Sequence, residues 1–495
     1  MAPKFEDSSR LPKQFVISRQ IPEAYSDWKT RRLNDWTVAA SAEVPIVALC
    51  AVDGVPSGYL IGWAINDGAL LADGTDLYLE PDKQAAFYDR LCGRYILLYR
   101  NDGATYARTD AGGLLPLVYC PQSNTAASTP TALLPWQNLE INSPVSKAFN
   151  IPPRHGWYPF GLTPFVGVTR LLPNHSLCLE SWQTERFWPR PQDIDAMAPA
   201  AADAEKIAIE IAKKTQKNVA AIIAAGRGIA HLTAGFDSRM VVAATKPYLA
   251  DCTFETVQAP NNDKSLDSDM AAMISAKLGL RHEFIEFIET PPAEIDAWLT
   301  RTGYCVYDHV TGLAATAERY DRQYHALTGT CGEVGRAYYW GDGIETSPVI
   351  SVETLLLRLG IPETEETIAA ANQWTQGLPV QGGSLFWDLA YIEQRLGCWA
   401  GPSVFGHNVS FPSLSPFNCH EIYRLMLSLP EEYRASQQFS RDFIGYLWPE
   451  LLNFPFNRAV GLSKLKYMRS EIPAILPDRL VSILKRIRKK LKSRI

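Results

Sequence analysis

Beyond about residue 200 the chain alternates between helical patterns and short apolar strands, and this alternation restricts the fold more than any other feature. A long helical stretch at 203–225 stops at Gly226, a residue type that commonly ends helices. The elements expected after it are a strand at 228–232, a helix ending before Pro247, a strand at 252–257, a helix at 266–278 and a strand at 282–287. Strands joined through helices run parallel, so the pattern predicts a parallel sheet covered by helices on both faces.

The first 190 residues have a different texture, with short β-like runs broken by glycine, proline and asparagine. Examples are 44–49, 94–99 and 177–179. A chain of 495 residues exceeds one ordinary core. We therefore expect an α/β protein with a β-rich α+β sandwich at 1–190, a parallel-sheet domain at 195–475 and a tail at 476–495.

Composition excludes several classes of protein. The nine cysteines form no C-x-x-C pair, so neither a zinc site nor a disulfide framework is indicated. The N-terminus is polar, and no run of about 18 apolar residues occurs, so we expect a cytoplasmic protein with no membrane-spanning segment. A net charge of -5 gives no reason to expect a nucleic-acid partner.

The stretch HLTAGFDSR, 231–239, places a small-residue turn directly after the first expected parallel strand. Ligands of parallel sheets sit beyond the carboxyl ends of the strands, and backbone N–H groups at a turn and helix start can hold a phosphate. Thr233, Gly235 and Ser238 are the candidates for that contact, with Leu232 and Phe236 beside them.

Asp237, in the same turn, would repel a bare phosphate, but its carboxylate is suited to a bridging Mg²⁺. The alternative is that Thr233 or Asp237 simply caps a helix. The chain contains neither a Walker A loop nor a G-x-G-x-x-G fingerprint.

The stretch LTGTCGEVGR, 327–336, repeats this chemistry: a short apolar lead, small residues that include Thr328 and Gly329, and then the acid Glu333. Two such turns in one sheet could place two carboxylates, Asp237 and Glu333, against Mg²⁺ and one triphosphate. The alternative is a glycine-rich loop that carries a surface glutamate.

Taken together, these motifs resemble those of the asparagine synthetase family. TAGFDS, 233–238, resembles its S-G-G-L-D-S pyrophosphate loop, and LTGTCGE resembles its L-S-G-x-G-x-D-E signature. DSDMAAMISAKLGLRH, 267–282, resembles the acidic-start helix between them. LCGRYILLY, 91–99, and RTDAGGLLPLVYC, 108–120, resemble pieces of its amidotransferase domain. The resemblance covers most of residues 90–430 and implies a glutaminase-like sandwich followed by a PP-loop ATP-pyrophosphatase domain, binding ATP and Mg²⁺.

The chain also departs from that family. Glutamine-hydrolysing members use a cysteine exposed as the first residue after Met removal, whereas residue 2 here is Ala and the first cysteine is Cys50. The resemblance thus implies a degenerate class II glutamine amidotransferase-like domain without glutaminase activity, kept as a structural relic or adapted to a substrate or partner. Thr330 and Glu333 stand where Glu and Asp are usual.

The family's lysine that stabilises charge during adenylation also needs a counterpart. Arg441 is the expected substitute, because a guanidinium can do the electrostatic part of that work, and Lys464 or Lys466 is the alternative. A general base for the amine is needed as well. His309, Asp308 and Glu393 are the available guesses.

The resemblance implies an AMP-forming carbon–nitrogen ligase that activates a small-molecule or peptide carboxylate and joins it to an amine or ammonia. A lasso-peptide-type macrocyclase, a β-lactam synthetase-like ring closure and an amidotransferase for a surface-polysaccharide sugar stay open. So do two other classes: a PP-loop thiolation or amination enzyme, which would need a sulfur-transfer cysteine such as Cys331, and a non-catalytic binding relative.

The C-terminal segment 479–495 holds eight lysines or arginines and no acid. Its apolar residues recur at helical spacing, which predicts a helix with one apolar stripe and one basic face. Three partners are compatible: the protein's own acidic surface, an anionic membrane surface and an acidic peptide.

Overall fold

The computed structural model describes residues 5–51, 54–80, 83–151, 156–197, 203–258, 262–286, 290–307, 324–340, 343–407 and 412–458. These residues form a mixed α/β structure that contains both antiparallel and parallel sheets, as expected. Lys464, Lys466, Asp308, His309 and the basic tail lie outside the described residues. No helix within the described ranges combines the length and apolar character needed to span a bilayer.

The N-terminal half contains a six-stranded antiparallel sheet in the order β13-β10-β11-β1-β3-β2. Its strands are β1 (Phe15–Ser18), β2 (Lys29–Leu33), β3 (Trp36–Ala40), β10 (Val118–Cys120), β11 (Thr125–Ala127) and β13 (Thr169–Arg170). A second sheet runs β15-β14-β9-β8-β5-β4-β7, with β6 added to β5. Its strands are β4 (Ile46–Cys50), β5 (Pro56–Asn66), β6 (Ala69–Leu70), β7 (Asp76–Tyr78), β8 (Cys92–Asn101), β9 (Ala104–Thr109), β14 (His175–Cys178) and β15 (Thr184–Arg186).

The second sheet is antiparallel except for the parallel pair β4–β7. Successive side chains of a strand point to opposite faces, and one face of each sheet packs into a shared core. Phe15 and Ile17 of β1 pack in the same buried cluster as Ile96 and Leu98 of β8, whereas Val16 belongs to a separate cluster on the outer side. The strands expected at 44–49, 94–99 and 177–179 correspond to β4, β8 and β14, with bounds that differ by a few residues.

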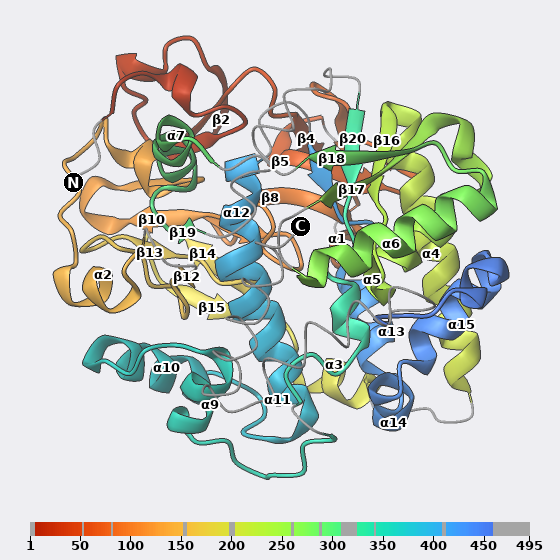
Figure 1. The fold of residues 1–495 in the computed structure, drawn as a ribbon. Coiled ribbons are helices and arrows are strands. Elements are labelled where there is room, and N and C mark those ends of the chain that lie inside the picture. The colour runs from red at the N-terminus through yellow and green to blue at the C-terminus, as the bar shows by residue number, and fades with distance from the viewer. Residues whose placement is uncertain are drawn as a thin grey trace, which may run out of the picture.

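A five-stranded parallel sheet follows in the order β18-β17-β16-β20-β21. Its strands are β16 (Arg227–His231), β17 (Cys252–Gln258), β18 (His282–Glu286), β20 (Tyr324–Leu327) and β21 (Ser413–Leu414). The helices α4 (Ala204–Ala225), α5 (Phe236–Ala244) and α6 (Asn262–Leu278) alternate with them and lie beside the sheet in Figure 1. The expected alternation is therefore confirmed, including the end of α4 at Gly226, and α6 begins four residues earlier than expected.

The remaining elements surround the two sheet systems. They are α1 (Gln84–Arg90), α2 (Ser143–Phe149), β12 (Gly156–Trp157), α3 (Pro191–Ala196), α7 (Pro292–Thr302), β19 (Val306–Tyr307), α9 (Val352–Leu359), α10 (Glu365–Gln376), α11 (Gly383–Ala390), η9 (Tyr391–Ala400), α12 (Gly401–His407), α13 (His420–Leu427), α14 (Glu431–Ala435) and α15 (Gln438–Leu447). In Figure 1 the blue rod of α11 and α12 runs between the N-terminal strands and the α13–α15 group.

A buried carboxylate joins the N-terminal half to this helical region. Glu393 of η9 accepts hydrogen bonds from both guanidinium nitrogens of Arg186, at 2.5 and 2.8 Å, from Asn174 at 2.9 Å and from the Trp374 indole at 2.7 Å. Although burial alone would raise it, the pKa of Glu393 is lowered by Arg186 and these hydrogen bonds. Glu393 is thus a structural anchor, fully enclosed by its partners.

Candidate functional site

The two small-residue turns follow neighbouring strands of the parallel sheet. β16 pairs with β20 in parallel register, with Ala230 opposite Leu327, so the turns after both strands emerge at the same edge. The order of the strands also reverses here, because β17 and β18 lie on one side of β16 while β20 and β21 lie on the other. Such a reversal point is where open parallel sheets bind ligands.

The turns pack against each other closely enough to require glycine. A Cβ atom at Gly329 would lie 2.8 Å from the carbonyl carbon of Asp237, and one at Gly332 would lie 3.5 Å from the Asp237 Oδ1 atom. Any larger residue at position 329 would push the backbones apart. The structure therefore brings together the two motifs that the sequence places about 90 residues apart.

The first turn is ordered by its own side chains. The hydroxyls of Thr233 and Ser238 lie 2.5 Å apart, and the Gly235 N–H donates to Thr233 Oγ1 at 3.1 Å. The Ala234 N–H donates to Asp267 Oδ1 at 2.8 Å, which ties the turn to α6. Leu232 is buried, and its carbonyl accepts a hydrogen bond from Thr256 Oγ1.

Asp237 lies in the first turn of α5, where the N-terminal end of the helix favours negative charge. Its two carboxylate oxygens accept hydrogen bonds from Arg336, at 3.1 Å from Nε and 2.8 Å from Nη2. Burial raises the pKa of Asp237, and the Arg336 charge opposes that rise. An internal cation therefore holds the carboxylate that the sequence predicts to bind metal.

Glu333 lies in the short helix η8 (Gly332–Gly335) and is partly buried. Its Oε2 atom is buried and has no hydrogen-bond partner. Burial and the nearby charge of Asp237 raise the pKa of Glu333 to about 7, while Arg336 and a hydrogen bond with Tyr391 lower it. Two partly buried acids beside one arginine leave the site short of positive charge.

This donor set fits Mg²⁺, an ion that commonly takes one or two protein carboxylates and completes its shell with phosphate oxygens and water. Glu333 offers an unpartnered oxygen, whereas Asp237 must first exchange one or both of its bonds with Arg336. Across the described ranges no group of three or more His, Cys, Asp or Glu side chains is placed to hold a metal ion. A metal ion bound here would therefore need further ligands from a bound substrate.

An aromatic stack forms a wall beside the first turn. The rings of Phe236 and Phe456 are parallel, with centroids 4.0 Å apart, and the Arg441 guanidinium lies 5.3 Å from the Phe236 ring and 5.4 Å from the Phe456 ring. The Asn457 N–H donates to the Ala234 carbonyl at 3.0 Å. Arg441 is thus brought next to the turn, in contact with its aromatic wall.

In the second turn, Thr328 Oγ1 lies 2.7 Å from Thr330 Oγ1, and the Thr328 N–H donates to Leu414. Cys331 is fully buried, and burial raises the pKa of its thiol well above the ordinary value. All nine cysteines are free, and all but Cys178 are buried.

Sequence reasoning missed three residues of this site. Arg336 is the last letter of LTGTCGEVGR and lies three residues after Glu333, so its proximity to that acid could have been noticed. Asp267 opens the quoted helix motif, and its position at an expected helix start was a second usable signal. Tyr391 belongs to the π-helical segment η9, which no local sequence pattern indicated.

In comparisons with known proteins, no family model matches the chain and no curated protein matches it.

Proposed function

We propose that the protein is an ATP-dependent ligase that activates a carboxylate as an acyl-adenylate, releases pyrophosphate and forms an amide bond, without glutaminase activity of its own. The observation that carries this proposal is the meeting of Asp237 and Glu333 at the strand-order reversal of the parallel sheet. The motifs' resemblance to those of asparagine synthetases supplies the reaction type. The same resemblance motivates the finer architecture, a degenerate amidotransferase-like sandwich followed by a PP-loop domain.

In the proposed reaction a carboxylate oxygen attacks the α-phosphorus of ATP, and pyrophosphate departs. An amine then attacks the acyl carbon, and AMP departs. Bound Mg²⁺ would offset the charge of the triphosphate. Thr233, Gly235 and Ser238 offer hydroxyl and backbone N–H groups to the phosphates, and Leu232, Phe236, Thr328 and Gly329 shape the edge of the site.

Arg336 gains a role in this proposal. Asp237 and Glu333 would hold the metal, and the Arg336 guanidinium that now binds Asp237 would then be available to the negative charge of the substrate. A guanidinium is suited to phosphate recognition because its N–H groups form a planar fork. Arg441, with Lys464 or Lys466 as alternatives, is the candidate for stabilising charge at the α-phosphate.

The structure bears unequally on the open alternatives. Cys331 is enclosed and its thiolate is disfavoured, which argues against it as a sulfur-transfer cysteine. Glu393 is surrounded by its hydrogen-bond partners, so we do not retain it as a general base. Amide formation with a free amine, macrocyclisation and modification of a sugar all share the adenylation half-reaction and stay open.

ATP–pyrophosphate exchange tests the proposal. Purified full-length protein would be incubated with Mg²⁺, ATP, labelled pyrophosphate and a panel of amino acids, short peptides and sugar acids. An adenylating ligase incorporates label into ATP only with an accepted carboxylate. A non-catalytic relative binds Mg²⁺–ATP and shows no exchange with any of them, which is the result that contradicts the proposal.

A further inference from the structure

A cavity of about 400 Å³ lies on the outer face of the eight-stranded sheet. It is lined by one row of side chains that crosses four strands and ends at the exposed Glu185, since Leu97 pairs with Arg108, Arg108 with Ser176, and Ser176 with Glu185. Directly opposite residues project to the same face of a sheet. α1 and the first residue of α13, His420, complete the walls.

Arg108 is the arginine of this cavity that has no acid partner. Its guanidinium stacks on the rings of Tyr99, at 4.8 Å, and Phe187, at 4.1 Å. Its Nε atom is buried without a hydrogen-bond partner. None of the ion pairs formed among the described residues involves Arg108. A partly buried guanidinium without a carboxylate is costly to keep unless an anion joins it.

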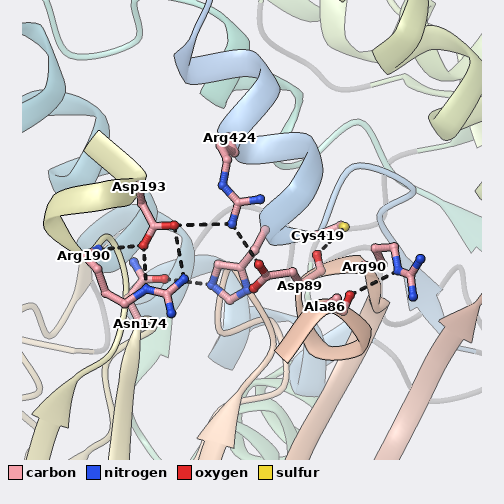
Figure 2. Close-up of polar contacts among 9 residues, drawn as sticks. Ala86, Asp89, Arg90, Asn174, Arg190, Asp193, Cys419 and Arg424 are labelled. Carbon is pink, nitrogen blue, oxygen red and sulfur yellow. Dashed lines mark hydrogen bonds and ion pairs between the residues drawn. The ribbon is translucent and has the colours of Figure 1, made fainter. Parts of the chain in front are cut away.

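The other arginines at this place are already neutralised. Arg186 is bound to Glu393, and Arg190 to Asp193. Figure 2 shows how the second pair continues, with Asp193 between Arg190 and Arg424, and Arg424 in turn reaching Asp89 of α1. The acid of α1 that lines the cavity is therefore occupied as well.

His420 adds no charge. It is buried, and its Nε2–H donates to Asn174 Oδ1, whose amide nitrogen is committed to Glu393. Burial lowers the pKa of His420 to about 4, so the ring is neutral at physiological pH. The remaining charged group, Glu185, is exposed at the rim.

Charge and shape together define the ligand. One unpaired guanidinium matches a single negative charge, and the carboxylates of Asp89 and Glu185 at the same cavity disfavour a dianion. Leu97, Phe187 and Trp188 line the cavity as well and offer apolar surface. The indole Nε1 of Trp188 is a further buried donor without a partner.

We propose that this cavity binds a small monocarboxylate with an apolar or aromatic body, its carboxylate on the Arg108 guanidinium and its body against the apolar wall. The inference is independent of the proposed ligase activity. It gives the N-terminal half a ligand site of its own.

Binding of phenylacetate to the full-length protein, measured by isothermal titration calorimetry without ATP or Mg²⁺, tests this. Phenylacetamide has nearly the same shape without the charge. We expect its affinity to be lower by at least roughly tenfold, since a charge-assisted hydrogen bond is lost. Inorganic phosphate is the third probe. If phosphate binds in an Arg108-dependent manner and more tightly than phenylacetate, the assignment to a monocarboxylate is overturned.

Arg108→Met keeps an unbranched apolar side chain between Tyr99 and Phe187 but removes the charge, and it should weaken phenylacetate binding by roughly tenfold to a hundredfold. Arg100→Met is the matched control, because Arg100 lies at the exposed end of the neighbouring strand β8 and does not line the cavity. Equal binding by wild type and Arg108→Met overturns the proposal, as does a folded wild-type protein that binds no phenylacetate.

Glu185→Gln covers the case in which Arg108→Met fails to fold. Glu185 is exposed, so this substitution leaves the core unchanged, and it removes a like charge from the ligand's surroundings. Phenylacetate should bind a few-fold more tightly to Glu185→Gln than to wild type, because the repulsion removed is that of one partly screened charge. Unchanged or weaker binding contradicts the placement of the carboxylate. Because no step requires ATP, failure here and failure of pyrophosphate exchange are separate results.

Discussion

The edge of the parallel sheet and the cavity on the outer face of the eight-stranded sheet have opposite imbalances of charge. At the first, Asp237 and Glu333 outnumber the single cation Arg336, and an oxygen of Glu333 is left without a partner. At the second, three arginines line the cavity and only Arg108 has no carboxylate. The first region is short of positive charge and the second of negative charge, which is why we assign a cation to one and an anion to the other.

The two regions also differ in how the chain assembles them. The acidic site is made by two turns, each continuous in sequence, that follow adjacent parallel strands. The basic cavity is made by single residues of four strands, brought into one row by antiparallel register. A site of the first kind leaves a motif in the sequence, whereas one of the second kind leaves isolated letters far apart.

The largest effect is expected from Asp237→Asn. The amide keeps the shape of the side chain but cannot offer a charge to Mg²⁺, so pyrophosphate exchange with the best carboxylate should fall by about 100- to 1000-fold. Asp251→Asn, at an exposed position before β17, is the control and should exchange normally. Exchange by Asp237→Asn within a few-fold of wild type would remove the acidic site from the reaction.

Low pH should destabilise the folded protein through His420, which lines the cavity beside Arg108. Burial lowers the pKa of His420 to about 4, so between about pH 6.5 and pH 4 the unfolded chain binds a proton that the folded protein excludes. The free energy of unfolding should therefore decrease as the pH falls through this window, by about 2–3 kcal/mol at pH 4.5. Urea unfolding at pH 7 and pH 4.5 measures the change.

His420→Gln supplies the control for that experiment, because its amide N–H can still donate to Asn174 but does not titrate. The variant should lose less stability than wild type over the same interval. An identical loss in both proteins would assign the acid sensitivity to other groups.

Arg336→Met tests whether Asp237 and Glu333 form a cation site. Without Arg336, two partly buried acids lie close together with no cation, and we expect a loss of about 1–3 kcal/mol in the free energy of unfolding. Millimolar Mg²⁺ should restore more stability to this variant than to wild type. Arg358→Met is a matched control, since Arg358 is similarly exposed and ion-paired with Glu345, but Mg²⁺ should not rescue it. Equal Mg²⁺ responses in the two variants would contradict a cation site at Asp237 and Glu333.

The smallest expected effect is none at all. Glutamine should release no glutamate and should not replace ammonium or an amine, because residue 2 is Ala and Cys50 is buried. A coupled glutamate assay on the purified protein measures this. Glutamate formation above the rate of a heat-treated sample would show that the protein hydrolyses glutamine by another nucleophile.

Much of the fold was readable from local pattern. The alternation of strands and helices after residue 200 predicted β16, α5, β17, α6 and β18 within a few residues, because periodicity and glycine stops act over short distances. The sequence also placed small residues in both turns, and the structure gives a packing reason for one of them, since the close approach at Gly329 admits no side chain.

Other features came only from the tertiary structure. The salt bridge of Arg336 to Asp237 joins residues 99 positions apart, and the hydrogen bonds of Asn174 and Arg186 with Glu393 join residues more than 200 positions apart. Nothing in a local window distinguishes Glu393, a buried anchor, from an exposed glutamate that could act as a base. Whether a carboxylate is buried and paired depends on which distant segments of the chain pack against it.

The sequence by itself determined where the chain turns and which turns carry acids, since these follow from residue type and short spacing. The tertiary structure alone decided which charges are paired. Strand order placed Arg336 on Asp237, and antiparallel register left Arg108 stacked between aromatic rings without an acid. The physical reason is that the energy of a charge in a protein depends on distance and solvent exposure, and both are set by contacts between segments remote in the chain.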